Sequence, residues 1–350
     1  MIDATAAPRA GEELDLVRLQ SYLGKPVIGV EQFPSGHSNL TYLIRLPGEE
    51  WVLRRPPFGS TVKTAHDMGR EFRILSKLHP VYPPAPRPLL YCEDPGVLGA
   101  PFYLMERRHG LVIRRRWPEA LGRSPELCRR MSEAFIDNLI ALHKVDYEAA
   151  GLGDFGKPEG YIARQVEGWA RRWVNAQTES LPDMDHVAAW LKSHMPAESR
   201  AAVIHNDYKF DNVMLNPDDP TRIVGVFDWE MATVADPLMD LGTALSYWMD
   251  ATDQPEFQAI AFAPTLGEGF PDRTRFLERY FDSSGREMAD VSYYYVYGLF
   301  KLAVILQQIF FRYTQGLTKD ARFASFAITV RLLSRQAAAA SAGGLQPGGW

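Results

Sequence analysis

A single segment, residues 202–230, constrains the fold of this chain more than any other. A short apolar run leads into the pattern His-x-Asp-x-x-x-x-Asn, whose fixed positions are His205, Asp207 and Asn212. Two further apolar runs follow, separated by a loop of asparagine, proline and aspartate, and the last run ends at Asp228. Short strand-forming runs joined by turn residues predict a buried scaffold that presents the polar residues at its ends.

The two runs after this pattern, Val213–Leu215 and Ile223–Phe227, are predicted to pair as an antiparallel hairpin about the loop Asn216–Pro220. This pairing puts Asn212 and Asp228 at the same open end, offset by about two residues, or roughly 7 Å along the strand. An amide oxygen and a carboxylate in this arrangement suit Mg²⁺, which prefers oxygen ligands and shares its coordination shell with substrate phosphates. The sequence therefore predicts a magnesium site at these two residues.

Asp207 precedes the hairpin on a loop, where its carboxylate could take the proton of a hydroxyl nucleophile. Together with a metal site five residues later, it supplies the parts needed for phosphoryl transfer from a nucleotide, in which catalysis is mostly positioning and charge neutralisation. His205 has two open interpretations, a catalytic residue or a buried structural histidine that braces the loop. Asp211 is predicted to be a solvated or capping residue and not a ligand.

Composition narrows the class of protein further. With 46% apolar and 12% aromatic residues in a chain of 350, bulk disorder is excluded and two lobes or domains are expected. The net charge of -5 argues against a nucleic-acid partner.

Two cysteines, Cys92 and Cys128, cannot form a disulfide framework, and with no signal-peptide pattern we expect a cytoplasmic protein. Lys301 interrupts the apolar run Val291–Leu306, which is shorter than the ~20 residues of a membrane span and is predicted to be a buried helix.

Hydrophobic periodicity predicts an α+β protein with a smaller β-rich part and a larger helical part. Strands are expected at Val27–Phe33, Leu40–Leu46, Trp51–Arg54 and Tyr103–Glu106, and a helix at Ala65–Leu78, followed by a proline-rich extended connector. Further helices are expected from a Ser124–Pro125 start to His143, at Tyr161–Trp173, at Met184–His194 and within Leu241–Ala338. The expected domains are an N-terminal lobe at residues 1–106, a helical lobe with the catalytic pattern and hairpin at 107–338, and a disordered tail at 339–350.

The sequence resembles a known family over nearly its whole length, roughly residues 13–338. Beside the His-x-Asp pattern, the resemblance lies in Ser35-Gly-His-Ser-Asn-Leu-Thr-Tyr42, Trp51-Val-Leu-Arg-Arg-Pro-Pro57, Ala65-His-Asp-Met68, Leu98–Glu106, Asp228-Trp-Glu-Met-Ala-Thr233, Asp236-Pro-Leu-Met-Asp-Leu241 and Tyr297–Gln308. These stretches are similar to the aminoglycoside phosphotransferase-like branch of the protein-kinase-like fold, and within it to kinase domains related to the N-terminal part of acyl-CoA dehydrogenase 10 and 11 proteins. The resemblance implies a bilobal protein-kinase-like fold and a phosphotransferase that uses ATP and Mg²⁺ and has an alcohol group as acceptor.

The resemblance also implies roles for residues of the catalytic pattern. Asp207 would orient and deprotonate the acceptor hydroxyl, and His205 would belong to the same catalytic set. Lys209 would neutralise charge on the migrating phosphoryl group, unless it is only a solvated lysine. Asn212 and Asp228 would hold Mg²⁺.

A second set of residues would bind the nucleotide. The turn over the phosphates would be formed by Ser35, Gly36, Ser38 and Asn39, Glu71 would pair with a cation on a strand, and Glu106 would begin the adenine-binding hinge. The strand cation is Arg54, where the family expects lysine, and arginine can contact phosphate oxygens through two parallel hydrogen bonds. Arg55 is the competing assignment, but strand alternation points it to the other face.

The acceptor stays open between several classes. The branch implies a small hydroxylated molecule such as a hydroxyacyl group on coenzyme A, whose phosphates the arginines at 114–116 would meet unless they form only an exposed loop. The alternative is an aminoglycoside or another amino sugar or alcohol, and the acidic residues that could suit such a polycation are Asp250, Asp253, Glu256 and Glu268. A catalytically silent nucleotide-binding pseudokinase is a further alternative, which the joint presence of Asp207, Asn212 and Asp228 disfavours. A metal-dependent hydrolase would need an additional His or carboxylate cluster.

Overall fold

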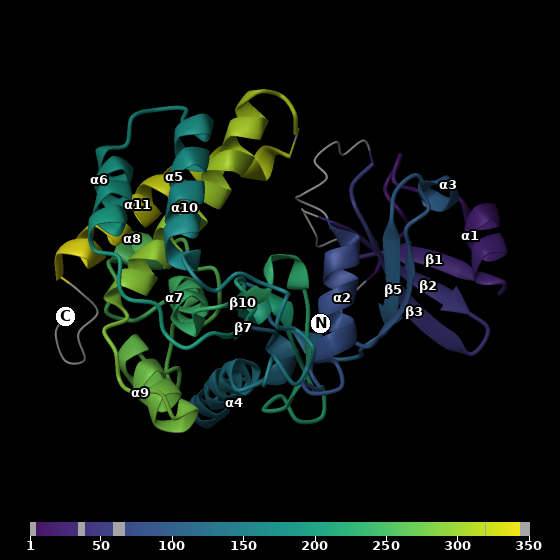
Figure 1. Cartoon of the computed structure of the whole chain (residues 1–350), viewed down its shortest axis with the longest axis horizontal. Coiled ribbons are helices and arrows are strands. Elements are labelled where there is room, and N and C mark those ends of the chain that lie inside the picture. Colours follow the sequence, from purple (N-terminus) through teal and green to yellow (C-terminus); the bar gives the residue numbers. More distant parts are fainter. Residues whose placement is uncertain (1–4, 34–38, 59–66, 319, 344–350) are drawn as a thin grey trace. The chain divides into compact units, whose positions relative to one another are not determined.

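A computed structural model describes residues 5–33, 39–58, 67–318 and 320–343, and in it the chain forms two compact units (Figure 1). The first unit comprises Met1–Val112, Glu148–Leu152 and Asn212–Ala232, and the second comprises Ile113–Tyr147, Gly153–Asp211 and Thr233–Trp350. Antiparallel sheets and helices occur together, which confirms the predicted α+β class. The hairpin segment groups with the first unit because its strand β8 (Val213–Leu215) pairs with β6 (Leu111–Val112).

The first unit is built on a five-stranded antiparallel sheet in the order β1-β2-β3-β5-β4. Its strands are β1 (Gly29–Gln32), β2 (Leu40–Leu46), β3 (Glu49–Arg55), β4 (Pro88–Cys92) and β5 (Phe102–Glu106). Its helices include α1 (Leu16–Leu23), α2 (Met68–Leu78) and α3 (Pro95–Leu98). Alternate residues of the central strands, among them Tyr42, Ile44, Leu53 and Leu104, share one buried core. All four strands predicted for this part are present, with ends shifted by at most two residues.

Strand β4 differs from the prediction, which treated the proline-rich segment as a connector without a strand. The strand begins at Pro88 and lies at the edge of the sheet. Proline is tolerated there because an edge strand does not need every N–H group for pairing. Helix α2 contacts these strands through Phe72, whose ring stacks on Tyr91 with the ring centroids 5.6 Å apart.

The predicted hairpin is confirmed. Strand β9 (Ile223–Val226) pairs with β8 in the register Val213↔Val226, and β6, β8 and β9 form a three-stranded sheet. The turn chemistry is also as expected, because the side-chain oxygen of Asn216 accepts the N–H groups of Asp218 and Asp219.

The second unit is mainly helical. Its helices are α4 (Pro125–His143), α5 (Tyr161–Ala176), α6 (Pro182–Ser193), α7 (Pro237–Tyr247), α8 (Pro255–Gln258), α9 (Arg273–Ser284), α10 (Ser292–Thr314) and α11 (Phe326–Gly343). A two-stranded sheet pairs β7 (Ala202–Ile204) with β10 (Thr233–Ala235). Helix α4 starts as predicted, with Pro125 at its first position and the Ser124 hydroxyl accepting the Leu127 N–H at 3.2 Å. Helix α11 continues to Gly343, beyond the expected start of the tail at residue 339.

Helix α10 contains the long apolar run and forms the centre of the second unit, in contact with α5, α6, α7 and α11. It is long and apolar enough to cross a membrane, but 72% of its most apolar 18-residue window is buried inside the protein. The prediction of a buried core helix is therefore confirmed.

The crossing of α7 and α10 depends on two glycines that face each other. A Cβ atom at Gly298 would lie 2.4 Å from the Gly242 carbonyl oxygen, which is closer than real Cβ contacts come. We expect Gly298→Ala to lower the free energy of unfolding by about 1–3 kcal/mol, because the backbones must separate. Gly168→Ala in α5 is the matched control, since its Cβ would meet nothing nearer than Arg172 Nη1 at 3.8 Å.

Urea unfolding of both variants measures this difference. In the control, exchange of a helical glycine for alanine should leave stability unchanged or raise it by up to about 1 kcal/mol. Equal effects at the two positions would contradict the close packing of α7 on α10.

Candidate active site

The loop at residues 205–212 follows β7 and carries the His-x-Asp pattern. Its backbone is held by the buried Asp240 of α7, whose two carboxylate oxygens accept the N–H groups of His205 and Asn206, each at 2.7 Å. Asn206 adopts a left-handed backbone conformation with φ of 65°, which costs energy in a residue other than glycine. Its side-chain amide donates to the Tyr161 hydroxyl at 2.9 Å. The residue before Asp207 is thus fixed by contacts on its main chain and its side chain.

The Asp207 carboxylate lies in the second unit and is held by two donors. Lys209 Nζ donates to Oδ2 at 2.7 Å, and the Tyr247 hydroxyl donates to Oδ1 at 2.7 Å. Burial alone would raise the pKa of Asp207, but the Lys209 and Lys301 ammonium groups and the two hydrogen bonds bring its pKa below the usual range. The carboxylate is therefore ionised and oriented, as a group that receives a proton must be before the reaction.

Asp211 was expected to be a solvated or capping residue, and the structure shows that it is not fully solvated. Its side chain is partly buried, and within the described residues its Oδ1 atom accepts no hydrogen bond. Burial raises the pKa of Asp211, against the opposing effect of the charges of Lys209 and Arg114. The nearby Asp207 charge raises it further. A second carboxyl group, with its pKa raised above the ordinary value, therefore interacts with Asp207.

His205 is fully buried, and its Nδ1 atom lies 3.2 Å from the Asp207 main-chain nitrogen. The Asp240 Oδ2 atom that accepts the His205 main-chain N–H also lies 3.1 Å from Nε2 of His143. Because the ring of His205 is shielded from solvent, its contacts favour the bracing interpretation over direct contact with a substrate.

Lys301 of α10 was treated in the sequence only as an interruption of an apolar run, and the structure gives it a specific place. It is 3% exposed, and its Nζ donates to the main-chain carbonyl of Asn206. Burial lowers the pKa of Lys301 to about 8, against the opposing effect of the Asp207 and Asp240 charges. The available signal was a single cation in a run of apolar residues, because charged side chains are rarely buried without partners.

In the first unit, Arg54 of β3 lies between two carboxylates. Its Nη2 donates to Asp228 Oδ1 at 2.9 Å, and its Nε lies 3.4 Å from Glu71 Oε2. Glu71 is buried on α2, and its other oxygen accepts the Trp229 N–H at 3.2 Å. Burial raises the pKa of Glu71, although the Arg54 charge opposes this shift. The cation and the two acids form one ion-pair cluster.

Arg55 points away from this cluster, as strand alternation predicts. Its guanidinium lies over the Phe58 ring, 3.5 Å from the centroid, and its Nε donates to the Pro56 carbonyl. Arg54 is therefore the strand cation that pairs with Glu71 and Asp228.

Asn212 and Asp228 lie at the same end of the β8–β9 hairpin. The Phe227 N–H donates to the Asn212 carbonyl at 2.9 Å, which extends the ladder to the two candidate ligands. Asp228 has a left-handed backbone with φ of 67°, and its side chain is 31% exposed. Within the described part of the chain, no three His, Cys, Asp or Glu side chains cluster as a metal site. Two oxygen donors fit Mg²⁺, because this ion usually takes few protein ligands and completes its shell with phosphates and water.

The remaining predicted nucleotide residues are only partly within the described chain. Ser35, Gly36 and Ser38 lie outside it. Asn39 is buried, and its amide donates to Glu230 Oε2 at 2.7 Å. Glu106 ends β5, and its main-chain N–H donates to the Arg87 carbonyl, so its own donor is committed to the neighbouring backbone.

The predicted site residues thus fall into two groups. Asp207, Lys209 and His205 are brought together in the second unit, and Arg54, Glu71, Asn212 and Asp228 lie in the first. Asn212 follows Asp207 by five positions in the sequence. The structure adds three groups that the sequence did not assign, namely Tyr247, Asp240 and Lys301.

Comparison with known proteins points to one family. A model of the phosphotransferase enzyme family (APH) matches residues 29–279. The mouse protein acyl-CoA dehydrogenase family member 10 is 33% identical over 292 residues, which cover 83% of this chain and 27% of that protein. Rat acyl-CoA dehydrogenase family member 11 is 29% identical over 317 residues, or 87% of this chain and 40% of that protein. The chain thus spans less than half the length of these relatives.

Solved structures agree with this comparison. A crystal structure from Ralstonia eutropha JMP134, provisionally classed as an aminoglycoside phosphotransferase, has a TM-score of 0.79 and 31% identity, and the match covers 95% of this chain and 100% of the other. The aminoglycoside phosphotransferase APH(4)-Ia, solved with ADP and hygromycin B, has a TM-score of 0.61 and 15% identity over 94% of this chain and 99% of the other. These matches confirm the kinase-like fold implied by the resemblance.

The buried Lys301 makes a testable prediction about stability. Its pKa is about 8 in the folded protein and 10.5 ordinarily, so between these values the unfolded chain binds more protons. The contribution of Lys301 to the free energy of unfolding should therefore rise with pH from about 8 to 10.5, by at most about 1.4 kcal/mol per pH unit. Lys301→Met should lack this slope when urea unfolding is measured across the window.

The control is Lys192→Met on an exposed position of α6, which should keep the pH dependence of the unaltered protein. Parallel profiles for the protein and Lys301→Met would show that Lys301 does not titrate in this range.

Proposed function

The chain belongs to the phosphotransferase enzyme family (APH), and from this premise we propose that it is a small-molecule kinase that transfers the γ-phosphoryl group of ATP to a hydroxyl group. The observation that carries the proposal is the Asp207 carboxylate, ionised and oriented by Lys209 and Tyr247. A carboxylate held in this way is suited to receive a proton from an alcohol. The presence of Asp207, Asn212 and Asp228 together favours a working enzyme over a silent pseudokinase.

In the proposed reaction the acceptor oxygen forms a bond to the γ-phosphorus while the bond from that phosphorus to the β,γ-bridging oxygen breaks. The acceptor hydroxyl proton passes to Asp207, and ADP leaves with the bridging oxygen. Lys209 would neutralise negative charge on the phosphoryl group during transfer. His205 would keep the loop in place without contacting the substrate.

The first unit would bind the nucleotide and its metal. Asn212 and Asp228 would hold Mg²⁺, which when bound neutralises charge on the phosphates. Arg54 would contact phosphate oxygens while Glu71 fixes its side chain. The adenine and phosphates would be recognised by Glu106 and the residues after it and by Ser35, Gly36, Ser38 and Asn39.

The acceptor we propose is a hydroxyacyl group carried on coenzyme A. Tyr247, which touches Asp207, packs edge-on against Phe262 with the ring centroids 6.0 Å apart, so an aromatic pair lies beside the proposed base. The segment that carries Phe262 is held by two arginines, since Arg115 donates to the Ala259 carbonyl and Arg123 to the Leu266 carbonyl. Apolar and cationic groups in one region suit an acyl chain with anionic phosphates.

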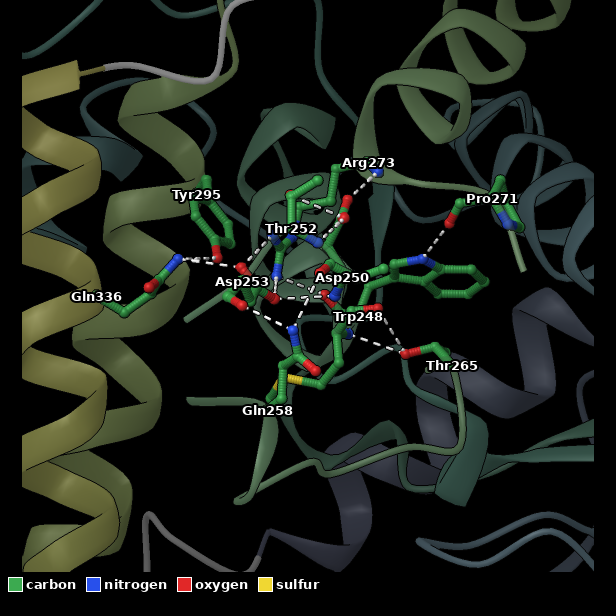
Figure 2. A network of polar contacts seen from close by, with 12 residues as sticks. Trp248, Asp250, Thr252, Asp253, Gln258, Thr265, Pro271, Arg273, Tyr295 and Gln336 are labelled. Carbon is green, nitrogen blue, oxygen red and sulfur yellow. Dashed lines mark hydrogen bonds and ion pairs between the residues drawn. The ribbon is translucent and has the colours of Figure 1, made fainter. Parts of the chain in front are cut away.

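A polycationic aminoglycoside is a poorer fit. Two of the acidic residues that could attract it, Asp250 and Asp253, are only 5% and 7% exposed. Figure 2 shows both turned toward Arg273, which donates to Asp253 through Nη1 at 2.8 Å and Nη2 at 2.7 Å. Their charge is therefore used inside the protein. Glu256 and Glu268 remain as acids outside this cluster.

Two substitutions separate the base from the metal ligand. Asp207→Asn should abolish transfer and leave ATP binding nearly unchanged, because Asp207 lies outside the unit proposed to bind the nucleotide. Asp228→Asn should weaken the Mg²⁺-dependent part of ATP binding at least tenfold, since asparagine keeps the left-handed backbone but lacks the charge. Calorimetric titration of ATP with and without Mg²⁺ measures binding by both variants, and ADP release in the presence of an acceptor measures transfer. Turnover by Asp207→Asn, or an unchanged magnesium dependence in Asp228→Asn, would reject the respective role.

The acceptor is tested by ADP release in the presence of candidate acceptors. A hydroxyacyl-CoA should stimulate ADP release and yield a phosphorylated product detectable by mass spectrometry, whereas the acyl-CoA of equal chain length without the hydroxyl should not. Kanamycin and hygromycin B form the second arm. Stimulation by the aminoglycosides alone would overturn the proposed acceptor but keep the kinase, and release that no acceptor changes would count against both.

A further inference from the structure

Tyr247, the last residue of α7, makes the contact with Asp207 that the sequence did not reveal. It is 7% exposed, and its hydroxyl donates to Asp207 Oδ1 at 2.7 Å. The face of its ring lies toward Lys209, whose Nζ is 4.9 Å from the ring centroid. One side chain therefore contacts both the proposed base and the proposed neutralising cation.

We propose that Tyr247 is a positioning residue of the phosphoryl transfer, which fixes the rotamer of Asp207 through its hydroxyl and the place of Lys209 through its ring. The inference rests on the proposed function only in that Asp207 is taken as the base. A carboxylate bound by one donor can rotate about its Cα–Cβ and Cβ–Cγ bonds, whereas donors on both oxygens define its plane. Pre-organisation of this kind raises the rate because the base need not be aligned during the reaction.

Tyr247 itself does not act as the base. Burial, together with the adjacent Asp207 charge, raises the pKa of the Tyr247 hydroxyl far above its ordinary value. The phenol therefore keeps its proton and serves as a donor to Asp207 throughout the accessible pH range.

The backbone next to Tyr247 is clamped by a buried ion pair, shown in Figure 2. The carbonyl of Trp248 accepts Arg273 Nη2 at 2.7 Å, and the indole N–H of Trp248 donates to the Pro271 carbonyl at 2.9 Å. Asp253 holds the guanidinium of Arg273 from the other side, and Gln336 of α11 donates to Asp253 at 3.2 Å. The backbone that carries Tyr247 is thus anchored by buried hydrogen bonds on the next residue, as a positioning role requires.

The first arm of the test is kinetic and uses Tyr247→Phe, which keeps the ring over Lys209 and removes only the hydroxyl. We expect kcat to fall about 10- to 100-fold, the effect of losing one oriented hydrogen bond to a charged group, with KM for ATP unchanged. Loss of a donor to the charged form raises the pKa of Asp207, while Lys209, Lys301 and Asp211 still face it. The acid limb of the pH profile of kcat should therefore move to higher pH.

The control is Tyr294→Phe, which removes the hydroxyl of another buried tyrosine that donates to an aspartate, Asp236, at 3.2 Å. It should leave both kcat and the acid limb as in the unaltered enzyme. An unchanged kcat and pH profile in Tyr247→Phe, or the same change in both variants, would overturn the positioning role.

The second arm does not depend on turnover. Carbon NMR of protein with labelled aspartate carboxyl groups follows the titration of Asp207, which the loss of its signal in Asp207→Asn identifies. The pKa of Asp207 should rise in Tyr247→Phe and stay constant in Tyr294→Phe. If no acceptor supports transfer but the pKa of Asp207 rises, the proposed function fails, while the effect of Tyr247 on Asp207 is confirmed. If transfer occurs and the pKa of Asp207 does not change, only the positioning role of Tyr247 fails.

Discussion

The buried carboxylate of Asp240 is the group on which the loop of the candidate site depends. It accepts the main-chain N–H groups of His205 and Asn206, and a buried carboxylate is stable only when its lone pairs are filled by donors. The left-handed backbone of Asn206 follows from this arrangement, because its N–H must reach Asp240 while its carbonyl accepts the ammonium of Lys301. Asp207 is the next residue, so these main-chain contacts fix the direction in which its side chain leaves the backbone.

The same reasoning explains the cluster of the first unit. Glu71 and Asp228 are both acids, and only a cation between them lets both lie so close. Arg54 does this with separate nitrogen atoms, Nε toward Glu71 and Nη2 toward Asp228. A lysine would have to contact both carboxylates from its single ammonium nitrogen, whereas arginine contacts each from a different nitrogen, so the two residues are not equivalent at this strand position.

The family sets the reaction class, but membership of the family does not name the acceptor. One fold commonly serves many substrates, because specificity resides in side chains placed on the scaffold. Here Asp253 forms an ion pair with the buried Arg273 and Asp250 accepts the main-chain N–H of the same arginine, while the ring of Tyr247, which contacts the proposed base, packs against Phe262. Structural likeness to enzymes that bind aminoglycosides therefore does not carry their acceptor to this chain.

Local physics allowed much of this protein to be predicted from its sequence. The β8–β9 hairpin, the strands of the larger sheet and the capped start of α4 each depend on periodicity, turn residues or a capping side chain within a few positions. The contacts that complete the site could not be predicted in this way. Tyr247 is 40 residues from Asp207, Lys301 is 95 from Asn206, and Arg54 is 174 from Asp228. These pairs meet only because helices and strands pack in one particular arrangement. The residues next to a side chain in the sequence do not indicate which distant partner it will contact.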